Sequence, residues 1–388
     1  MNQEEWLQFV KKIKIIYDSK FIPLHEPTFN NKEIEYVTDC IESGWVSSVG
    51  SYVNKFEEEL AKFIGVKRAV AVVNGTAALH IALKVAGVKA NDEVLIPSLT
   101  FVATANAVSY LNAIPHFIDV SNETMGIDPL KLDDHLKKIG EMHGGHLFNK
   151  LTGRHISAVV PMHTFGHSMD IDGILNVCDR YNLMLIEDAA ESLGTYYKGK
   201  HTASFGKINA ISFNGNKIIT TGGGGAIVTN DDELADYAKH LTTTAKLHHR
   251  WQYEHDEIGY NYRMPNINAA LGCAQMEQLP HFIEQKRGLA DIYEKLVKQL
   301  TGVKLFKEPL HSRSNYWLQT IIIDEQYELE KVLEFLNEQG IMSRPIWTPL
   351  HHLPMYKDCP KSDLSVCESL YKKTLNIPST PITVEENE

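Results

Sequence analysis

The chain has 388 residues, of which 43% are hydrophobic and 22% charged, as is typical of a globular enzyme with more than one core. Its formal net charge of −11 argues against a nucleic-acid or anionic-membrane partner, and no apolar run reaches the roughly 20 residues of a membrane span. Five scattered cysteines without metal-type spacing and an acidic, polar N-terminus predict a cytoplasmic protein with reduced thiols and no signal peptide.

The first 30 residues are expected to form an amphipathic helix and then an extended arm. Apolar residues recur at helical spacing from Trp6 to Ile16, and Pro23 and Pro27 follow. We expect this helix to pack on the body of the protein or on a second subunit. Two further helices are predicted at 31–43 and 52–64, with a loop between them.

From Arg68 onward, strand and helix patterns alternate. Strands are predicted at 68–73, 93–97, 114–118, 156–162, 184–187, 208–213 and 225–229, and helices at 76–86, 104–111 and 171–181. This order predicts an α/β fold whose mostly parallel sheet is covered on both faces. Active sites in such sheets lie beyond the carboxyl ends of the strands.

Two segments depart from this alternation. Residues 127–154 are polar and rich in His and Gly, which predicts a helix at 129–139 and then a mobile surface loop. We predict no metal site there, because no carboxylate or cysteine stands at ligand spacing.

After a helix at 231–244, the pattern changes to long helices at 267–279 and 281–300, strands at 316–323 and 341–344, and a helix at 329–339. The predicted units are therefore an arm (1–30), a large domain (31–250) and a smaller α+β domain (251–388).

A lysine and an acid beyond two strand ends give the first chemical signal. Asp188 ends a predicted apolar strand, and Lys217 lies on a loop before the glycine run at 222–225. A lysine amine can form a C=N bond with the aldehyde of pyridoxal phosphate, and a carboxylate can keep that cofactor's ring nitrogen protonated. Alone, Lys217 could be a surface charge and Asp188 a cap. Their combination favours a pyridoxal phosphate enzyme.

A candidate phosphate site precedes both residues. Gly75, Thr76 and Ala77 lie where the strand at 68–73 gives way to a helix. Unpaired N–H groups and the helix dipole favour an anion there, Gly75 permits close approach, and Thr76 offers a hydroxyl. An ordinary turn with a Thr cap is the alternative, but Asp188 and Lys217 make the phosphate interpretation the favoured one.

Five segments match one pattern in the same order: Asn74–Ala78, Pro97–Ala103, Glu187–Gly194, Ser212–Gly225 and Gly259–Arg263. On these segments the chain resembles the DegT/StrS family of pyridoxal-phosphate-dependent nucleotide-sugar aminotransferases, from about Ile22 to the C-terminus. The resemblance implies the aspartate aminotransferase-like fold (fold type I). It also implies a homodimer with shared active sites and neither nucleic-acid nor membrane partners.

A closer resemblance suggests the substrates. Residues 21–27, 46–50 and 212–217 look like the bacillosamine and legionaminic-acid branch of the family. Its members use L-glutamate to aminate C4 of a UDP-linked 4-keto-6-deoxy-N-acetylhexosamine for bacterial surface glycans. Many family members carry Glu where this chain has Gly223, a departure that this branch tolerates.

The resemblance assigns the two central roles and two packing roles. Lys217 would hold the cofactor and then move the substrate proton, and Asp188 would face the ring nitrogen. Ala190 would pack on one cofactor face and Phe101 would stack on the other, with plain core packing as the alternative for Phe101.

The resemblance also implies further cofactor contacts. Ser212 would bind the phosphate beside Thr76 and Ala77, and Asn261 would reach it from the other subunit, with a turn residue as the alternative. Glu191 would meet the cofactor's phenolic oxygen. Because two anionic oxygens repel each other, the alternatives are that Glu191 is protonated or that it faces the sugar.

Substrate contacts are inferred from position and charge. A diphosphate needs a cation in so acidic a chain, and the predicted closure of the second domain brings several polar residues toward the site. The candidates are Ser47, Ser48, His163, Glu191, Arg263, Arg344, His351 and His352. A capped core histidine is the alternative for His163, and a plain loop is the alternative for Ser47 and Ser48.

Three other functions stay open. A related aminotransferase could act on a 3-keto sugar or on a perosamine-type 4-keto sugar, and a pyridoxal-phosphate-binding regulator could use the same scaffold without turnover. A sugar dehydratase of this scaffold would resemble versions with histidine in place of Lys217, so the lysine argues against it.

Overall fold

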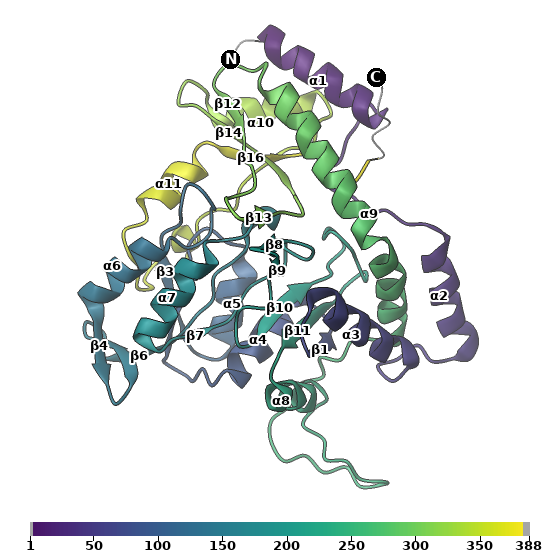
Figure 1. The fold of residues 1–388 in the computed structure, drawn as a ribbon, viewed down its shortest axis with the longest axis vertical. Coiled ribbons are helices and arrows are strands. Elements are labelled where there is room, and N and C mark those ends of the chain that lie inside the picture. The colour runs from purple at the N-terminus through teal and green to yellow at the C-terminus, as the bar shows by residue number, and fades with distance from the viewer. Residues whose placement is uncertain (1–2, 383–388) are drawn as a thin grey trace.

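The computed structural model describes residues 3–382 (Figure 1). Its helices are α1 (Gln3–Tyr17), α2 (Asn31–Ser43), α3 (Ser51–Ile64), α4 (Gly75–Val85), α5 (Val102–Tyr110), α6 (Pro129–Ile139), α7 (Ile171–Tyr181), α8 (Asp232–Thr242), α9 (Asn266–Val297), α10 (Leu329–Glu338) and α11 (Ser365–Tyr371), with short 3-10 turns η1 (Thr164–Gly166) and η2 (Leu350–His352). The strands of the first half are β1 (Arg68–Val72), β2 (Glu93–Pro97), β3 (Ile114–Ile118), β4 (Gly140–His143), β5 (His146–Asn149), β6 (Arg154–Val159) and β7 (Met184–Leu185). Those of the second half are β8 (Tyr196–Tyr197), β9 (Lys200–His201), β10 (Asn209–Ser212), β11 (Gly225–Thr229), β12 (Val303–Leu305), β13 (Ser312–Arg313), β14 (Gln319–Ile323), β15 (Arg344–Pro345) and β16 (Thr374–Ile377).

The central sheet is mostly parallel, as predicted. Strands β3, β2, β6 and β7 pair in parallel, and β11 pairs antiparallel with both β10 and β1. Asp188 joins the two parts, because it bridges in parallel to Met162 on one side and to Ala210 on the other. Along the order β3-β2-β6-β7-β10-β11-β1 only β11 is reversed, and the hairpin β4–β5 adds an antiparallel extension at β6.

Both faces of this sheet are covered, which follows from the alternation of side chains along its strands. In β2, Val94 and Ile96 join the large hydrophobic cluster that includes residues of α4 and α5. Leu95, between them, joins a different cluster with Leu132 of α6 and Ile174 of α7. One strand thus packs against helices on each side of the sheet.

The N-terminal helix packs on the body of the protein, one of the two predicted placements. Trp6 and Ile13 of α1 are fully buried against the later half of α9 and the antiparallel sheet β12-β14-β16-β15. Figure 1 shows α1 beside the upper end of α9, far along the chain. The domain borders at residues 30 and 250 stay predictions.

The loop predicted after residue 139 was wrong. Residues 140–149 form the hairpin β4–β5, and β5 continues the pairing onto β6. Gly144 and Gly145 turn the hairpin with φ of +58° and +82°, a conformation that side-chain-bearing residues rarely adopt. The Gly-Gly pair was therefore a hairpin signal rather than a sign of mobility.

The two long helices predicted around Pro280 are in fact one, α9 (Figure 1). A proline inside a helix removes one hydrogen bond, which led to the predicted break. Both halves of α9 are nevertheless anchored, since Leu279 and Ile283 on either side of Pro280 lie in the same hydrophobic cluster. Tertiary packing thus stabilises a continuous helix despite the proline.

Two further expectations from the sequence concern membrane-spanning segments and the state of the cysteines. Within residues 3–382, none of the helices combines the length and the apolar character needed to cross a bilayer. All five cysteines are free thiols, and Cys40, Cys178, Cys273 and Cys367 are buried.

Candidate active site

A cavity of about 320 Å³ lies beyond the carboxyl ends of the central strands. Its walls come from the start of α4, from α5, from the segments that follow β6, β7 and β10, and from two tryptophans of the C-terminal part. The residues that line it are Asn74, Gly75, Thr76, Leu79, Phe101, Ala103, Thr104, Met162, Asp188, Ala190, Glu191, Ser212, Asn214, Asn216, Lys217, Trp317 and Trp347. Eight of the sequence-predicted site residues, among them Lys217 and Asp188, therefore meet in one place.

Lys217 points into this cavity from the loop after β10. Its Nζ donates a hydrogen bond to Glu191 Oε1 at 3.2 Å and lies 3.9 Å from the centre of the Trp317 ring, and only 13% of the side chain is exposed. The Trp317 Nε1–H donates to the Asn216 carbonyl at 2.7 Å, which holds the loop directly before the lysine. The amine is thus fixed in position and shielded from solvent on one side.

Glu191 is a buried carboxyl group beside this amine. Burial raises the pKa of Glu191 to about 7, although the Lys217 ammonium and a hydrogen bond from the Phe165 N–H oppose the shift. Near neutral pH this group can therefore be either charged or protonated. That property suits a group that must lie close to another anionic or hydroxyl oxygen.

Asp188 is the second buried carboxylate of the cavity. Thr104 Oγ1 donates to its Oδ2 at 2.8 Å, and the Ala190 N–H donates to Oδ1 at 3.2 Å. Burial raises the pKa of Asp188 above its usual value, against the effect of these two hydrogen bonds. Because no cation contacts the carboxylate directly among residues 3–382, it is available to a cationic partner within the cavity.

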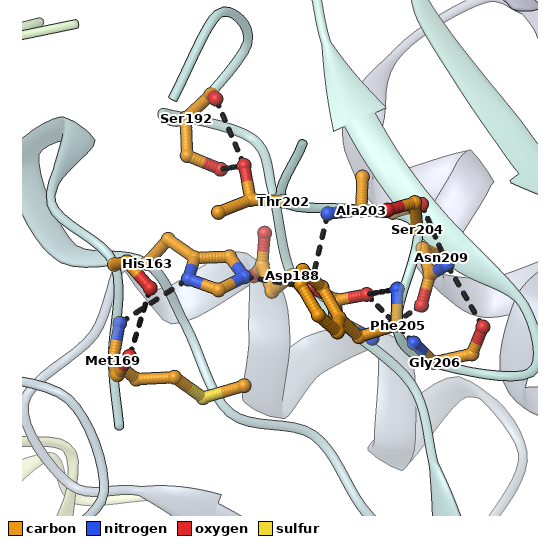
Figure 2. A network of polar contacts seen from close by, with 12 residues as sticks. His163, Met169, Asp188, Ser192, Thr202, Ala203, Ser204, Phe205, Gly206 and Asn209 are labelled. Atoms are coloured by element: carbon orange, nitrogen blue, oxygen red, sulfur yellow. Dashed lines mark hydrogen bonds and ion pairs between the residues drawn. The ribbon is translucent and has the colours of Figure 1, made fainter. Parts of the chain in front are cut away.

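The neighbouring Glu187 holds the strand end that carries Asp188. It accepts hydrogen bonds from His163 Nε2 at 2.9 Å, and from the N–H groups of Ala203, Phe205 and Gly206 at 2.7–2.9 Å (Figure 2). Burial alone would raise the pKa of Glu187, but these hydrogen bonds outweigh it and lower the pKa.

His163 completes this network and stays away from the cavity. It is fully buried, and Figure 2 shows it between Met169 and the chain at Asp188, with its backbone N–H bonded to the Asp188 carbonyl. The sequence left two interpretations of His163, a contact with the sugar or a capped histidine in the core. Its position in the structure is that of a capped core histidine.

The start of α4 forms a polar corner of the cavity. Asn74 caps the helix by accepting from the Ala77 N–H at 2.8 Å, so that amide, predicted to bind phosphate, is already engaged. Within the described part of the chain, the N–H groups of Gly75 and Thr76 have no acceptor. A Cβ added at Gly75 would lie 2.8 Å from the Ser212 Cβ, so only glycine allows this close approach.

These features fit pyridoxal phosphate. The free N–H groups at a helix start and the Thr76 and Ser212 hydroxyls suit its phosphate. Lys217 offers an amine for its aldehyde, and the buried Asp188 offers an anion for its ring nitrogen. Phe101, 52% exposed, and Ala190 line the same cavity as candidates for the two ring faces.

Four predicted residues lie together outside the cavity. Arg263 Nη2 donates to the Ser48 carbonyl at 2.6 Å, and the loop that carries Ser47 and Ser48 rests on the start of α9. Asn261, exposed, bridges to Thr243 in the same region. None of these four residues lines the Lys217 cavity of the same chain.

Three further candidates are also placed elsewhere. Arg344 is exposed on β15, and His351 and His352 both bond to Glu368. Among the described residues that line the cavity, Lys217 is the one cationic side chain. A diphosphate would therefore need a cation from outside this wall.

Comparison with known proteins supplies the family. The model of the DegT/DnrJ/EryC1/StrS aminotransferase family matches residues 27–388. A GDP-perosamine synthase of Escherichia coli O157:H7 is 40% identical over 362 residues, which cover 93% of this chain and 94% of that protein. The chain belongs to the DegT/DnrJ/EryC1/StrS aminotransferase family. It is therefore a pyridoxal-phosphate-dependent sugar aminotransferase.

Two other similar proteins support the same assignment. A UDP-4-amino-4,6-dideoxy-N-acetyl-beta-L-altrosamine transaminase of Campylobacter jejuni is 33% identical and covers 90% of each chain. The crystal structure of a DegT/DnrJ/EryC1/StrS aminotransferase from Brucella abortus superposes with a TM-score of 0.82 at 29% identity, covering 92% of each chain. The expected aspartate aminotransferase-like fold is thereby confirmed for this sugar aminotransferase.

Several side chains in and beside the cavity of this sugar aminotransferase were not predicted from the sequence. Thr104, Trp317 and Trp347 carry no local motif that separates them from ordinary helix or core residues. Glu187 did carry a signal, since it directly precedes Asp188 in an extended segment. Side chains alternate there, so a second acid must face the opposite side of the sheet.

Proposed function

We propose that this aminotransferase transfers the amino group of L-glutamate to C4 of a UDP-linked 4-keto-6-deoxy-N-acetylhexosamine. The observation that carries the transfer chemistry is the shared cavity of Lys217 and Asp188 beside the free N–H groups of α4. Two observations support a UDP-linked sugar as the substrate. The segments at 21–27 and 46–50 resemble the bacillosamine and legionaminic-acid branch, and the Campylobacter relative acts on a UDP-linked 4-amino sugar. The product would serve the synthesis of bacterial surface glycans.

Each cavity residue has its own role in the proposed amino-group transfer. When bound, pyridoxal phosphate supplies an aldehyde and an electron-accepting ring. Lys217 Nζ holds that cofactor, then takes the proton from the α-carbon of L-glutamate and later delivers a proton to C4 of the sugar. Asp188 keeps the ring nitrogen protonated, and Thr104 holds the carboxylate in place.

Glu191 has a second role in this proposal. With a pKa near neutrality, it can accept the proton that Lys217 releases, or donate a hydrogen bond to an oxygen of the sugar. The hydrogen bond from Trp317 to Asn216 holds the loop that carries Lys217, and the Phe165 N–H holds Glu191.

The proposal is tested by measuring turnover with L-glutamate and three acceptors. The UDP-4-keto-6-deoxy-N-acetylhexosamine should be aminated at C4, and Lys217→Ala should lower the rate by at least about 100-fold. Lys137→Ala, which removes an exposed lysine on α6, is the matched control and should keep full activity. Turnover of the UDP sugar at the background rate contradicts the proposed substrate.

The second candidate is a perosamine-type reaction on a GDP-linked 4-keto-6-deoxyhexose without an N-acetyl group. The 40% identity with a GDP-perosamine synthase favours it. A GDP-linked acceptor that turns over faster than the UDP sugar would select this candidate, and a 3-keto sugar is the third arm of the same assay. A regulator without turnover would also fail to exchange its amino group with L-glutamate alone.

We further propose a homodimer whose active sites are shared. The cavity has one cationic side chain, whereas Asn261 and Arg263 lie outside it in the same chain. Large apolar side chains are exposed on the two loops that neighbour these residues: Trp45, Val46 and Val49 between α2 and α3, and Trp251, Tyr253 and Ile258 after α8. Exposed aromatic and aliphatic side chains of this kind suit a subunit contact.

Mixing two inactive variants tests the shared site. If Asn261 acts in the partner's cavity, Lys217→Ala and Asn261→Ala subunits together regain about a quarter of the wild-type activity, because half of the dimers carry one intact site. Absence of recovery, with mixed dimers demonstrated by differently tagged chains, contradicts sharing. We propose a cytoplasmic location as well, which five unpaired cysteines support.

A further inference from the structure

Three side chains of the types that bind metal ions converge outside the Lys217 cavity. His351 and His352 end η2, and Glu368 lies on α11. The ring nitrogens of both histidines and a carboxylate oxygen of Glu368 lie within 4.8 Å of one another. We propose that these three residues form a binding site for a divalent transition-metal ion of the zinc type.

The contacts show that the three side chains already face one point. His351 Nε2 lies 2.8 Å from Glu368 Oε1, and His352 Nε2 lies 2.6 Å from the same oxygen. Zinc holds such ligands at about 2.0–2.1 Å, which separates neighbouring ligand atoms by about 3.3 Å. Small side-chain rotations are therefore enough to admit the ion.

Ser98 supplies the support that a metal-binding imidazole usually has. Its Oγ lies 2.7 Å from His351 Nδ1 at the carboxyl end of β2, and Ser98 itself is fully buried. When Nδ1 carries its proton and donates to Ser98, Nε2 has its lone pair free for a metal ion. The backbone adds to this anchoring, because the Leu350 N–H donates to the Ser98 carbonyl at 2.9 Å.

The type of ligand selects the ion. Two imidazoles with one carboxylate suit zinc and its transition-metal neighbours, whereas magnesium and calcium prefer oxygen ligands alone. The site is open to solvent on the side of His352 and Glu368, whose side chains are 39% and 34% exposed, whereas the His351 side chain is 10% exposed. A water molecule can therefore fill the fourth position.

Among the described residues, one other group of three such side chains brings its ligand atoms within 4.8 Å of one another. In that group, His240 faces Asp256 and Glu257 with a single imidazole. His116 contacts Glu93 through Nδ1 and His135 through Nε2, so these three side chains do not face one point. In the β4–β5 hairpin, His143 contacts Glu141 at 3.2 Å on the surface, without a second imidazole joining that carboxylate. His240 thus offers a matched comparison, because its Nε2 also bonds to a carboxylate oxygen, at 2.7 Å.

A bound ion would join parts of the chain that are otherwise connected by hydrogen bonds. It would tie η2 to α11 and, through Ser98, to the end of β2, near the segment that places Trp347 in the cavity. Its expected role is structural, so the readout is metal affinity and thermal stability rather than turnover.

Calorimetric titration of zinc chloride into the tag-free, chelator-treated holoenzyme tests the site. We expect one ion to bind per chain, with a raised unfolding temperature. His352→Gln and Glu368→Gln should each weaken binding at least tenfold, and His240→Gln should leave it unchanged. Ser98→Ala should weaken binding by roughly tenfold through His351.

Cobalt provides a second readout on the same variants. Bound Co²⁺ should give the visible absorption of a low-coordinate nitrogen and oxygen site, and this absorption should be lost in His352→Gln. Wild-type protein that binds neither ion, or binding that persists unchanged in the double variant His352→Gln/Glu368→Gln, overturns the proposal. Both variants alter partly exposed side chains, and circular dichroism verifies that they fold.

Discussion

Two buried carboxylates, Asp188 and Glu191, share one cavity, but their partners prepare them for different tasks. Asp188 accepts only from uncharged donors, Thr104 and the Ala190 N–H, so its charge is left for a cofactor. Glu191 already has the Lys217 ammonium at 3.2 Å. Asp188 and Glu191 are three residues apart in the sequence, and their side chains contact different partners in the cavity wall.

Thr104→Val should impair the chemistry without removing any charged group. The valine keeps the shape of the side chain but no longer donates to Asp188. A hydrogen bond to a charged group contributes about 1.5 kcal/mol, so kcat should fall about tenfold. Steady-state kinetics with the sugar substrate provides the measurement.

Thr164→Val is the matched control for this change. Thr164 is also buried and donates to a carbonyl, that of Met125, but it does not touch Asp188. The Thr164→Val variant should lose about as much free energy of unfolding as Thr104→Val, but it should keep the wild-type kcat. Equal kcat values for both variants would mean that the Thr104 hydroxyl does not support Asp188 in catalysis.

Glu191→Gln should change how the stability of the cofactor-free protein depends on pH. The folded pKa of Glu191 is about 7, against an ordinary value of 4.5. Its stabilising contribution is complete below pH 4.5 and is lost as pH rises to about 7, because only the folded state holds the proton in that window. The loss is on the order of 3 kcal/mol, from 1.36 kcal/mol per pKa unit.

Urea unfolding between pH 4.5 and 8 measures this effect. The glutamine cannot titrate, so the free energy of unfolding of the variant should gain on that of the wild type as pH rises through this window. Parallel curves for the two proteins would show that the Glu191 carboxyl group titrates at its ordinary pKa.

At the scale of elements, the start of α4 shows how a helix can be capped and still offer donors. Asn74 satisfies the Ala77 N–H, and the two preceding N–H groups face the cavity. Helix starts have such unpaired donors by construction, so the anion site needs no basic side chain. This explains how an acidic chain of net charge −11 can still bind a phosphate.

Gly75→Ala should weaken cofactor binding. The new Cβ would lie 2.8 Å from the Ser212 Cβ, so α4 and β10 must move apart where the phosphate is expected to bind. Overpacking of this kind costs about 1–3 kcal/mol, which corresponds to at least a fivefold rise in the dissociation constant. Absorbance titration of the cofactor-free protein with pyridoxal phosphate measures it.

Gly223→Ala serves as the comparison for Gly75→Ala. A Cβ at Gly223 meets only the Val73 carbonyl, at 3.9 Å, and the backbone there is not in the left-handed region. Cofactor affinity should therefore be unchanged. If both alanine variants bind the cofactor as the wild type does, the α4 corner does not hold the phosphate.

At the scale of the whole molecule, the most exposed aromatic side chains lie on the long loop after α8. Trp251 and Tyr253 are 72% and 81% exposed, and Figure 1 shows this loop extending from the body below α8. Large aromatic side chains of this kind often anchor protein interfaces. The loop is thus the natural contact of the proposed dimer.

Replacing both aromatics by serine, Trp251→Ser with Tyr253→Ser, should weaken that dimer. Loss of an anchor residue costs about 2 kcal/mol or more, so the dissociation constant should rise at least about 30-fold. Sedimentation velocity at several concentrations measures the shift. Leu310→Ser, an equally exposed apolar site elsewhere, should leave the dimer intact. A variant that sediments like the wild type assigns the interface to another surface.

The amino-acid sequence was sufficient for most of the cofactor side of the cavity. Asp188, Lys217 and the Gly75–Thr76 corner each follow a strand whose apolar residues mark it locally. Parallel strands place their carboxyl ends at one edge, so residues that follow such strands must gather there. Local periodicity and topology together therefore determine this half of the site.

Only the tertiary structure decided which distant side chains complete the cavity. Trp317 holds the lysine loop through a bond to a residue 101 positions away. Outside the cavity, the Ser98–His351 contact joins residues 253 apart in the same way. Pro280 likewise lies inside one helix because packing on both sides outweighs a lost hydrogen bond. Such contacts depend on how whole layers pack, and neighbouring residues in the chain do not encode that packing.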